Sequence, residues 1–290
     1  MIHKNTFSKI GRDKEYTSSV ENKPNAGEIM EEFIGSGSYK RLKELANKND
    51  SINKNIYNHL IDHEAKRHEI GCHLVAKFIP KKIFKYDYAG LNEYLNDRGL
   101  LQNLTKLTST DLKKSPALLD LFEPYRLSPE FYIKPSFNQL GREFVKIAES
   151  EDLQITLEEA AKQKRDYMDR LKAAKLEYGS LKKQMQNCQY LSTVRKIPHK
   201  YGSVSLIQKP FIYDSQKIRD DSLINTLIER GKPDLDGLML YVTRGFVSLS
   251  EIESFRTLVD IQLNFAIFDI NDDAKMMSYF YQKALRRAII

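Results

Sequence analysis

The sequence predicts an α-rich α+β fold, with a helical N-terminal region, a long central helical arm and a smaller mixed α/β C-terminal region. Apolar residues recur at helical spacing early in the chain, the stretch from Thr156 to Cys188 lacks proline, and β-branched and aromatic runs gather after Pro198. We therefore predict a flexible tail (1–25), a helical domain (26–115), a proline-punctuated connector (116–155), the arm (156–190) and a mixed α/β domain (191–290).

The helical domain should consist of several short helices and one long helix. A Gly-Ser-Gly-Ser turn at 35–38 separates the first two, and Gly99 separates the last two. The long helix is expected to begin at Asp50 or Ser51, because apolar residues recur at helical spacing from there to Leu74. Proline is expected to end that helix at position 80. The predicted helices cover 26–34, 39–48, 50–79, 88–96 and 100–107.

The connector carries four of the nine prolines of the chain between Pro116 and Pro135. Proline lacks a backbone N–H and restricts the residue before it, so this density prevents a long helix. The aromatic residues of the segment indicate that it packs on the rest of the protein. We expect an extended connection with short pieces of secondary structure.

The clearest predicted element is the long basic helix of the arm. Thr156 and Glu159 have the spacing of a capping box, and Gly179 is the one residue in the stretch that weakens a helix. The apolar positions follow a heptad spacing over three heptads, which is typical of a weak coiled coil. Such a seam has to be buried against another helix, either of the same chain or of a second copy. The seam consists of Tyr167, Leu171, Ala174, Tyr178, Leu181 and Met185.

The C-terminal region has the composition of a mixed α/β domain. β-branched and aromatic residues predict strands at 203–213, 238–249 and 261–270. Helices are expected between and after them, at 220–230, 250–258 and 273–289.

Four of the six histidines lie between residues 59 and 73. His59 and His63 are four residues apart, so a helix would project both rings from one face, as a shared Zn²⁺ requires. A metalloprotease is not predicted, because Asp62 stands where the inverted zinc motif needs a longer Glu. The competing interpretation, ordinary surface and half-buried histidines, carries more weight. The candidate metal ligands are His59, His63, Cys72 and His73.

No catalytic constellation in the sequence is complete. The Gly-Ser-Gly-Ser turn lacks the third glycine and the downstream motifs of a kinase, and no phosphate loop or nucleophile elbow is found. Asp269, Asp272 and Asp273 follow a predicted strand and are the best candidates for a two-metal nuclease. Capping of free amides is the commoner role for such residues. We expect no catalytic residue and no cofactor.

Positive charge is concentrated in the arm and just beyond it, where residues 162–200 hold eleven basic and three acidic side chains. Such a field attracts nucleic acid or an acidic protein, although a solvated helix face has the same composition. Aromatic residues also alternate with lysines at 78–88, as in proteins that bind single strands. The candidate nucleic-acid contacts are Lys81, Lys82, Lys85, Lys172, Lys175, Lys182, Lys183, Arg195, Lys196 and Lys200.

Composition favours a folded cytoplasmic chain without a membrane partner. Hydrophobic residues make up 41% and charged residues 29%, which argues against disorder, and we find neither a bilayer-length apolar run nor an export signal. Cys72 and Cys188 are therefore expected to be reduced. The lysine-rich composition without tryptophan is typical of an AT-rich genome, for instance that of a phage or a mobile element.

The predicted function is non-enzymatic. We expect a homo-oligomeric protein–protein interaction or assembly protein, such as a phage or mobile-element accessory that binds and inhibits a host protein complex. A nucleic-acid-binding protein is the alternative, and a metal-dependent nuclease or hydrolase is the third hypothesis.

Overall fold

In the computed structural model the described residues are 24–148 and 152–288, so the predicted flexible tail lies almost wholly outside them. The chain is a helix-rich mixture of α-helices and small antiparallel sheets, which confirms the predicted α+β class. The arm is also confirmed, as α8 (Leu157–Gln186). Its capping box is present: the Glu159 N–H donates to Thr156 Oγ1 (3.3 Å), and the Thr156 N–H donates to Glu159 Oε2 (3.0 Å).

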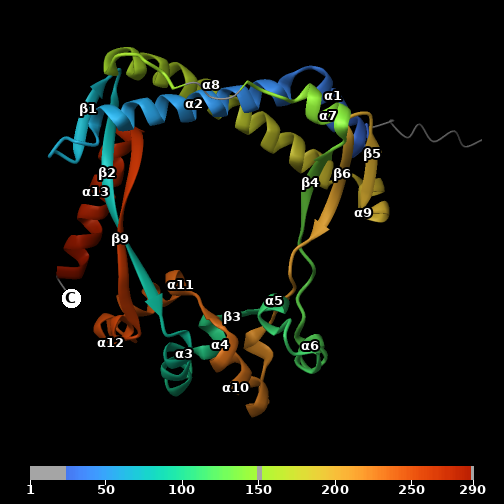
Figure 1. The fold of residues 1–290 in the computed structure, drawn as a ribbon. Coiled ribbons are helices and arrows are strands. Elements are labelled where there is room, and N and C mark those ends of the chain that lie inside the picture. The colour runs from blue at the N-terminus through green and yellow to red at the C-terminus, as the bar shows by residue number, and fades with distance from the viewer. Residues whose placement is uncertain (1–23, 149–151, 289–290) are drawn as a thin grey trace, which may run out of the picture.

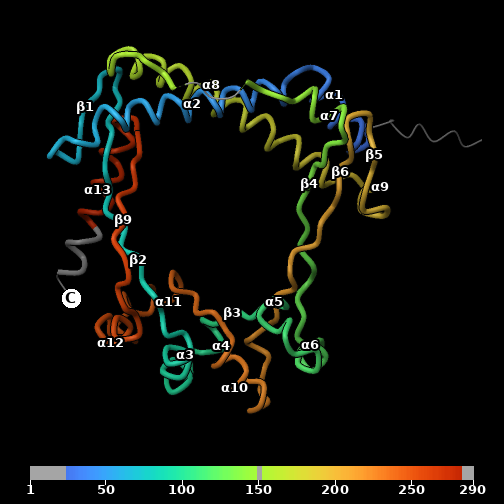
Figure 2. Tube along the Cα trace, in the orientation of Figure 1, coloured from blue at the N-terminus to red at the C-terminus, as the bar shows by residue number. Residues whose placement is uncertain are grey.

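The elements form the sides of an open frame (Figure 1). Helix α2 (Ser38–Leu60) runs beside α8 along one side. An antiparallel pair of long strands, β2 (Leu74–Tyr86) and β9 (Arg256–Asp269), forms the next side. A second antiparallel pair, β4 (Phe131–Phe137) and β6 (Gly202–Gln208), lies opposite the first. Short helices close the frame, and no described element crosses its middle (Figures 1 and 2).

The accessible surface agrees with this open shape. The chain exposes 20498 Å², whereas a compact protein of this mass exposes about 13,000 Å². The molecule therefore has no single central core.

Three separate hydrophobic cores hold the frame together. The first combines residues 91–122 with 213–252, and the second combines 26–34, 133–145 and 185–206. The third combines 52–78 with Ala160 and Ala161. Each core therefore joins segments that lie far apart in the sequence. The predicted division into consecutive domains stays a prediction.

The remaining elements are short, apart from the last helix. The helices are α1 (Ala26–Gly35), α3 (Tyr88–Asp97), α4 (Leu101–Leu104), α5 (Ser109–Leu112), α6 (Pro116–Phe122), η1 (Glu123–Tyr125), α7 (Gln139–Phe144), α9 (Gln189–Val194), η2 (Ser215–Lys217), α10 (Asp221–Arg230), α11 (Leu235–Thr243), α12 (Leu249–Ser254) and α13 (Ile270–Ala288). The strands are β1 (Arg67–Gly71), β3 (Thr105–Thr108), β5 (Lys196–His199), β7 (Ile212–Tyr213) and β8 (Lys232–Pro233). Together with β2, β4, β6 and β9, these strands form three antiparallel sheets, in the orders β1-β2-β9, β7-β3-β8 and β4-β6-β5.

The predicted helix over 50–79 is wrong beyond Leu60, where α2 ends and a β-hairpin of β1 and β2 follows. Cys72 and His73 form its two-residue turn, and both have positive φ angles (50° and 57°), as a primed hairpin turn requires. Neither turn residue is Gly or Asn, so the turn positions lack the residues by which a primed hairpin turn is usually predicted. Pro80 lies within β2, beyond the end of β1, where its missing N–H breaks no ladder hydrogen bond.

Two other expectations also need correction. The predicted strand at 238–249 is wrong, because Asp234 caps helix α11 by accepting a hydrogen bond from the Gly237 N–H (3.1 Å). A short apolar run of this kind fits a buried helix as well as a strand. The predicted helix at 100–107 is instead the single turn α4 followed by strand β3.

Candidate interaction surface

One face of the β2–β9 pair is covered by α2 and α8, but only at one end of the strands. There Leu74, Ala76 and Phe78 belong to the third core, and Phe265 and Ile267 of β9 pack against it. Tyr57 of α2 contacts the rings of Phe78 and Phe265, with centroids 5.7 Å and 5.4 Å away. This end of the strand pair is therefore part of a hydrophobic core.

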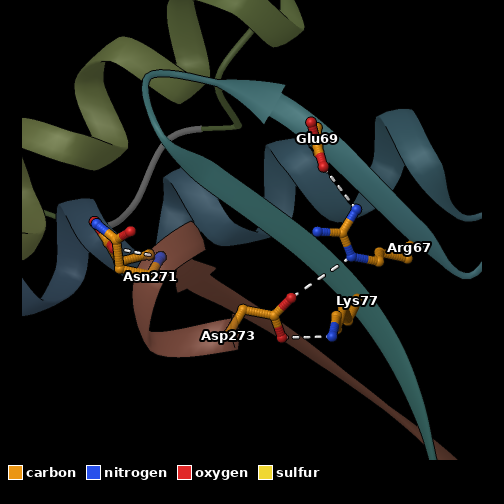
Figure 3. Close-up of polar contacts among 6 residues, drawn as sticks. Arg67, Glu69, Lys77, Asn271 and Asp273 are labelled. Atoms are coloured by element: carbon orange, nitrogen blue, oxygen red, sulfur yellow. Dashed lines mark hydrogen bonds and ion pairs between the residues drawn. The ribbon is translucent and has the colours of Figure 1, made fainter. Parts of the chain in front are cut away.

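Helix α13 is fixed to the strand pair by a buried ion pair (Figure 3). Asp273, which is 2% exposed, accepts a hydrogen bond from Lys77 Nζ, and Arg67 Nε lies 3.5 Å from its other oxygen. Arg67 also pairs with Glu69 at 2.8 Å. Asp273 stands in the first turn of α13, where the helix dipole favours a negative charge. The cluster therefore fastens the start of α13 to β1 and β2.

The three carboxylates considered for a nuclease are each engaged by a basic side chain. Asp273 binds Lys77, Asp269 binds Arg165 of α8 at 2.5 Å, and Asp272 lies 3.6 Å from Lys275. The hydrogen bonds from the Arg165 guanidinium and from the Asn271 N–H lower the pKa of Asp269. The arrangement ties β9 and α13 to neighbouring elements.

The other end of the strand pair is uncovered. We call residues 79–86 of β2 and 256–264 of β9 the bare ribbon. Every residue from Thr257 to Asn264 is exposed, including Val259 (56%), Ile261 (52%) and Leu263 (55%). β1 pairs only with residues 74–77 of β2, and within the described chain β9 has no strand on its outer edge. The bare ribbon therefore has apolar side chains and two strand edges in contact with solvent.

Helix α13 carries further exposed apolar side chains, on the face of the strand pair to which Lys77 points and opposite the face of Ile261 and Leu263. Beyond Asp273 it presents Met277 (55% exposed), Phe280 (54%) and Tyr281 (66%) to solvent. Large apolar patches are uncommon on monomeric proteins and mark interaction sites. We define the candidate interaction surface as two exposed apolar groups, Val259, Ile261 and Leu263 on the bare ribbon and Met277, Phe280 and Tyr281 on α13.

The predicted seam of α8 packs within its own chain. Leu171 and Met185 are buried, and Tyr178 stacks on Phe33 of α1 with centroids 5.5 Å apart. Tyr178 also contacts Tyr39 of α2 edge-on at 5.6 Å. Tyr167, Ala174 and Leu181 are half-buried. The sequence left open whether the seam is buried against the same chain or against a second copy. In the structure it packs against helices of the same chain.

A buried lysine lies between the same two helices. Lys164 is 5% exposed, and its Nζ donates to Asn49 Oδ1 (2.7 Å) and Asn53 Oδ1 (2.5 Å) of α2. Burial lowers the pKa of Lys164, Asp50 partly opposes this and Lys175 adds to it, and together they bring the pKa to about 8. No carboxylate within the described residues forms an ion pair with it. The α2–α8 contact therefore carries an electrostatic cost at neutral pH.

The predicted nucleic-acid residues do not converge on one surface. Lys81, Lys82 and Lys85 lie exposed on the bare ribbon, next to stacked Tyr86 and Tyr88 (centroids 5.6 Å). The rest lie elsewhere on the frame. Lys172, Lys175, Lys182 and Lys183 lie on α8, and Arg195, Lys196 and Lys200 lie around β5 near the second core.

The predicted metal ligands are not brought together. His63 lies beyond the end of α2, so it does not share a helix face with His59, which contacts the Ile155 carbonyl at 2.9 Å. Cys72 and His73 form the hairpin turn. Across residues 24–148 and 152–288, no group of three or more His, Cys, Asp or Glu side chains gathers where it could hold a metal ion.

Sequence reasoning missed the candidate interaction surface, although it placed a strand at 261–270. A signal was available. From Val259 to Phe265 the residues alternate strictly between apolar and polar, which is typical of a strand with one apolar face. Whether that face lies against a core depends on the surrounding elements, which the strand's own sequence does not describe.

Comparison of the chain with protein-family models, with curated proteins and with solved structures finds no match. In the part of the chain that the structure describes, no helix is long and apolar enough to cross a membrane.

Proposed function

We propose that the protein is a non-enzymatic interaction protein that assembles with other protein through the candidate interaction surface. The observation that carries the proposal is the exposure of Val259, Ile261 and Leu263 on a strand that has an open edge. Burying such side chains contributes about 25 cal/mol per Å² of apolar area. An open edge also offers backbone groups that a partner strand can pair with.

The proposal moves the predicted contact from the seam of α8 to the ribbon. Leu171 is already buried and Met185 already belongs to the second core, so a partner could reach them only by displacing elements of the same chain. The bare ribbon requires no such rearrangement. A cytoplasmic location and a role as a phage or mobile-element inhibitor of a host complex remain parts of this proposal that rest on composition.

Site-specific photo-crosslinking tests the proposal in cells that make the full chain. A benzophenone side chain would replace Leu263 or Phe280, and, as the control, the equally exposed Leu121 of α6. We expect discrete protein adducts from positions 263 and 280, and loss of the 263 adduct when Ile261→Lys is added. Absence of adducts at both positions, or the same adducts from position 121, would overturn the proposal.

Nucleic-acid binding is a second candidate, favoured by Lys81, Lys82 and Lys85. These side chains are exposed, form no ion pair within the described chain, and lie beside stacked aromatic rings. Phosphate contacts and base stacking act together in single-strand binders. Because the ribbon and α8 are separate sides of the frame, Lys81→Glu with Lys82→Glu can be compared with Lys172→Glu with Lys175→Glu.

A gel-shift titration with single-stranded DNA at several salt concentrations distinguishes the two surfaces. If the ribbon binds, the first pair should weaken binding and flatten the salt dependence, and the second pair should have little effect. A wild-type chain that fails to shift DNA at low salt would remove this candidate.

A further inference from the structure

We infer that the partner on the open edge of β9 is a second copy of this chain, joined antiparallel to β9 about a two-fold axis at Gln262. This inference deepens the proposed function and rests on it. Three features of β9 favour this pairing: the direction of its backbone groups, the order of its side chains and the lack of a strand on its outer edge.

The backbone direction follows from the β1–β2–β9 register. The Phe78 N–H donates to the Lys66 carbonyl (2.9 Å), on the side away from β9, so the neighbouring odd-numbered residues of β2 point their backbone groups toward β9. Their partners on β9 are the even-numbered residues, among them Gln262, opposite Lys81. Ile261 and Leu263 therefore point their N–H and C=O groups to the open edge.

An antiparallel second copy centred on Gln262 matches these groups. Ile261 of one chain lies opposite Leu263 of the other, and each pair can exchange two backbone hydrogen bonds. In the single chain the Ile261 N–H is instead covered by the Asp260 carboxylate at 2.8 Å. That contact confirms that the donor faces away from β2 and is available once Asp260 moves.

The side chains fit the same register, because the sequence from Val259 to Phe265 is symmetric in character about Gln262. Apolar residues then lie opposite apolar residues, with Val259 facing Phe265 of the other copy. Asp260 lies opposite Asn264, whose amide can donate to the carboxylate, so like charges do not meet. A second copy supplies this register without any further requirement, because both strands carry the same alternation and the same Asp260 and Asn264.

The edge also lacks the side chains that usually prevent such pairing, and the β-bulge of β9, at Val259, lies at the end of the pairing segment. From Ile261 to Phe268, β9 has no lysine, proline or other charged residue. The one charged side chain nearby, Asp260, lies at the margin of the pairing region. Pro80, which would block an edge, lies on β2, so only the β9 edge is open to addition.

Sedimentation of the full chain tests the inference directly. The wild type should form a dimer at micromolar concentration. Ile261→Pro removes a donor that the β2–β9 ladder does not use, so it should yield a monomer with an unchanged circular dichroism spectrum. Ile261→Thr keeps the donor and a β-branched side chain, so it should still form dimers. A wild-type chain that stays monomeric at about 100 µM, a concentration at which even a dimer with a micromolar Kd would be almost fully formed, would overturn the inference.

Disulfide trapping tests the register. In a chain carrying Cys72→Ser and Cys188→Ala, Gln262→Cys would place two sulfur atoms across the axis, where Cα atoms lie about 4.5 Å apart and a disulfide can form. Asn264→Cys, the matched control, faces Asp260 of the other copy. Mild oxidation should crosslink the first variant at least tenfold faster than the second. Equal rates would overturn the register.

The outcome also separates this inference from the proposed function. Photo-adducts from position 263 that contain a different protein, together with a monomer by sedimentation, would leave the proposed function standing and reject the second copy. Absence of both would reject the two together.

Discussion

The two halves of the β2–β9 pair have similar side chains and opposite surroundings. In the covered half Phe78, Phe265 and Ile267 pack against α2 and α8, and α13 is pinned to the strands by Asp273. In the bare half Val259, Ile261 and Leu263 are each more than half exposed to solvent. Apolar content alone therefore does not make a core. Whether the apolar face of a strand pair becomes core therefore depends on the elements that pack against it. In the bare half no such element is present among the described residues, and a partner could bind there.

A buried carboxylate should produce the largest effect. Leu171→Asp places a carboxylate at a position of α8 that is 6% exposed, and we expect a loss of more than about 3 kcal/mol of unfolding free energy. Leu176→Asp is the control, because Leu176 is 67% exposed on the same helix. Chemical denaturation followed by circular dichroism measures both. Equal stability of the two variants would mean that the stripe is not core.

Removal of Asp273 should cost slightly less. Asp273→Ala leaves the Lys77 ammonium buried without its partner, which typically costs about 3 kcal/mol. Asp272→Ala, in the same turn, removes a carboxylate that is 72% exposed. Its loss of unfolding free energy should be only a few tenths of the loss in Asp273→Ala. Hydrogen exchange should also show faster opening of α13 in the Asp273 variant alone. Unchanged protection of α13 would count against its anchoring role.

Truncation on the two halves gives the most direct comparison. Phe78→Ala should destabilise the chain by about 3 kcal/mol, because it opens a cavity in the third core. Leu263→Ala should cost less than about 0.5 kcal/mol in a monomeric sample, because its side chain is already exposed. Denaturation at low and high protein concentration would measure both. A large cost for Leu263→Ala that does not depend on concentration would show that the bare half is covered within the chain.

The smallest expected effect concerns Lys164. Its pKa is about 8 in the folded chain and near 10.5 when unfolded, so the folded state binds fewer protons between these values. Stability should therefore rise as the pH rises from 8, by about 2 kcal/mol before the tyrosines ionise near pH 10. Lys164→Met should remove this rise. Denaturation at pH 7.5 and 9.5 tests it, and a wild-type stability that falls over this interval would contradict the burial of the charge.

The sequence predicted the parts of this fold whose signals are local. The capping box at Thr156 and the uninterrupted spacing after it were enough to define α8, and the β-branched run at 261–270 was enough to place β9. The hairpin at Cys72 and His73 was missed because its turn residues are not those that favour positive φ. The candidate surface was missed for another reason. Ile261 is exposed because no described element packs on that part of β9. The pairing of β9 with β2 also joins distant parts of the chain, which local sequence signals do not predict.

That distance affects how the protein is made. Leu74 lies opposite Asp269, and about 170 residues separate the end of β2 from the start of β9. At ordinary translation rates of 5–20 residues per second, roughly 10 to 30 s pass between the synthesis of the two strands. Contacts this distant in sequence also slow folding, since a long loop must close before they form. During that interval β1, α2 and, once it has been made, α8 can cover β2, but its pairing with β9 cannot form. Joining of two chains through β9 therefore follows synthesis, and nascent chains that lack β9 cannot be captured by this edge.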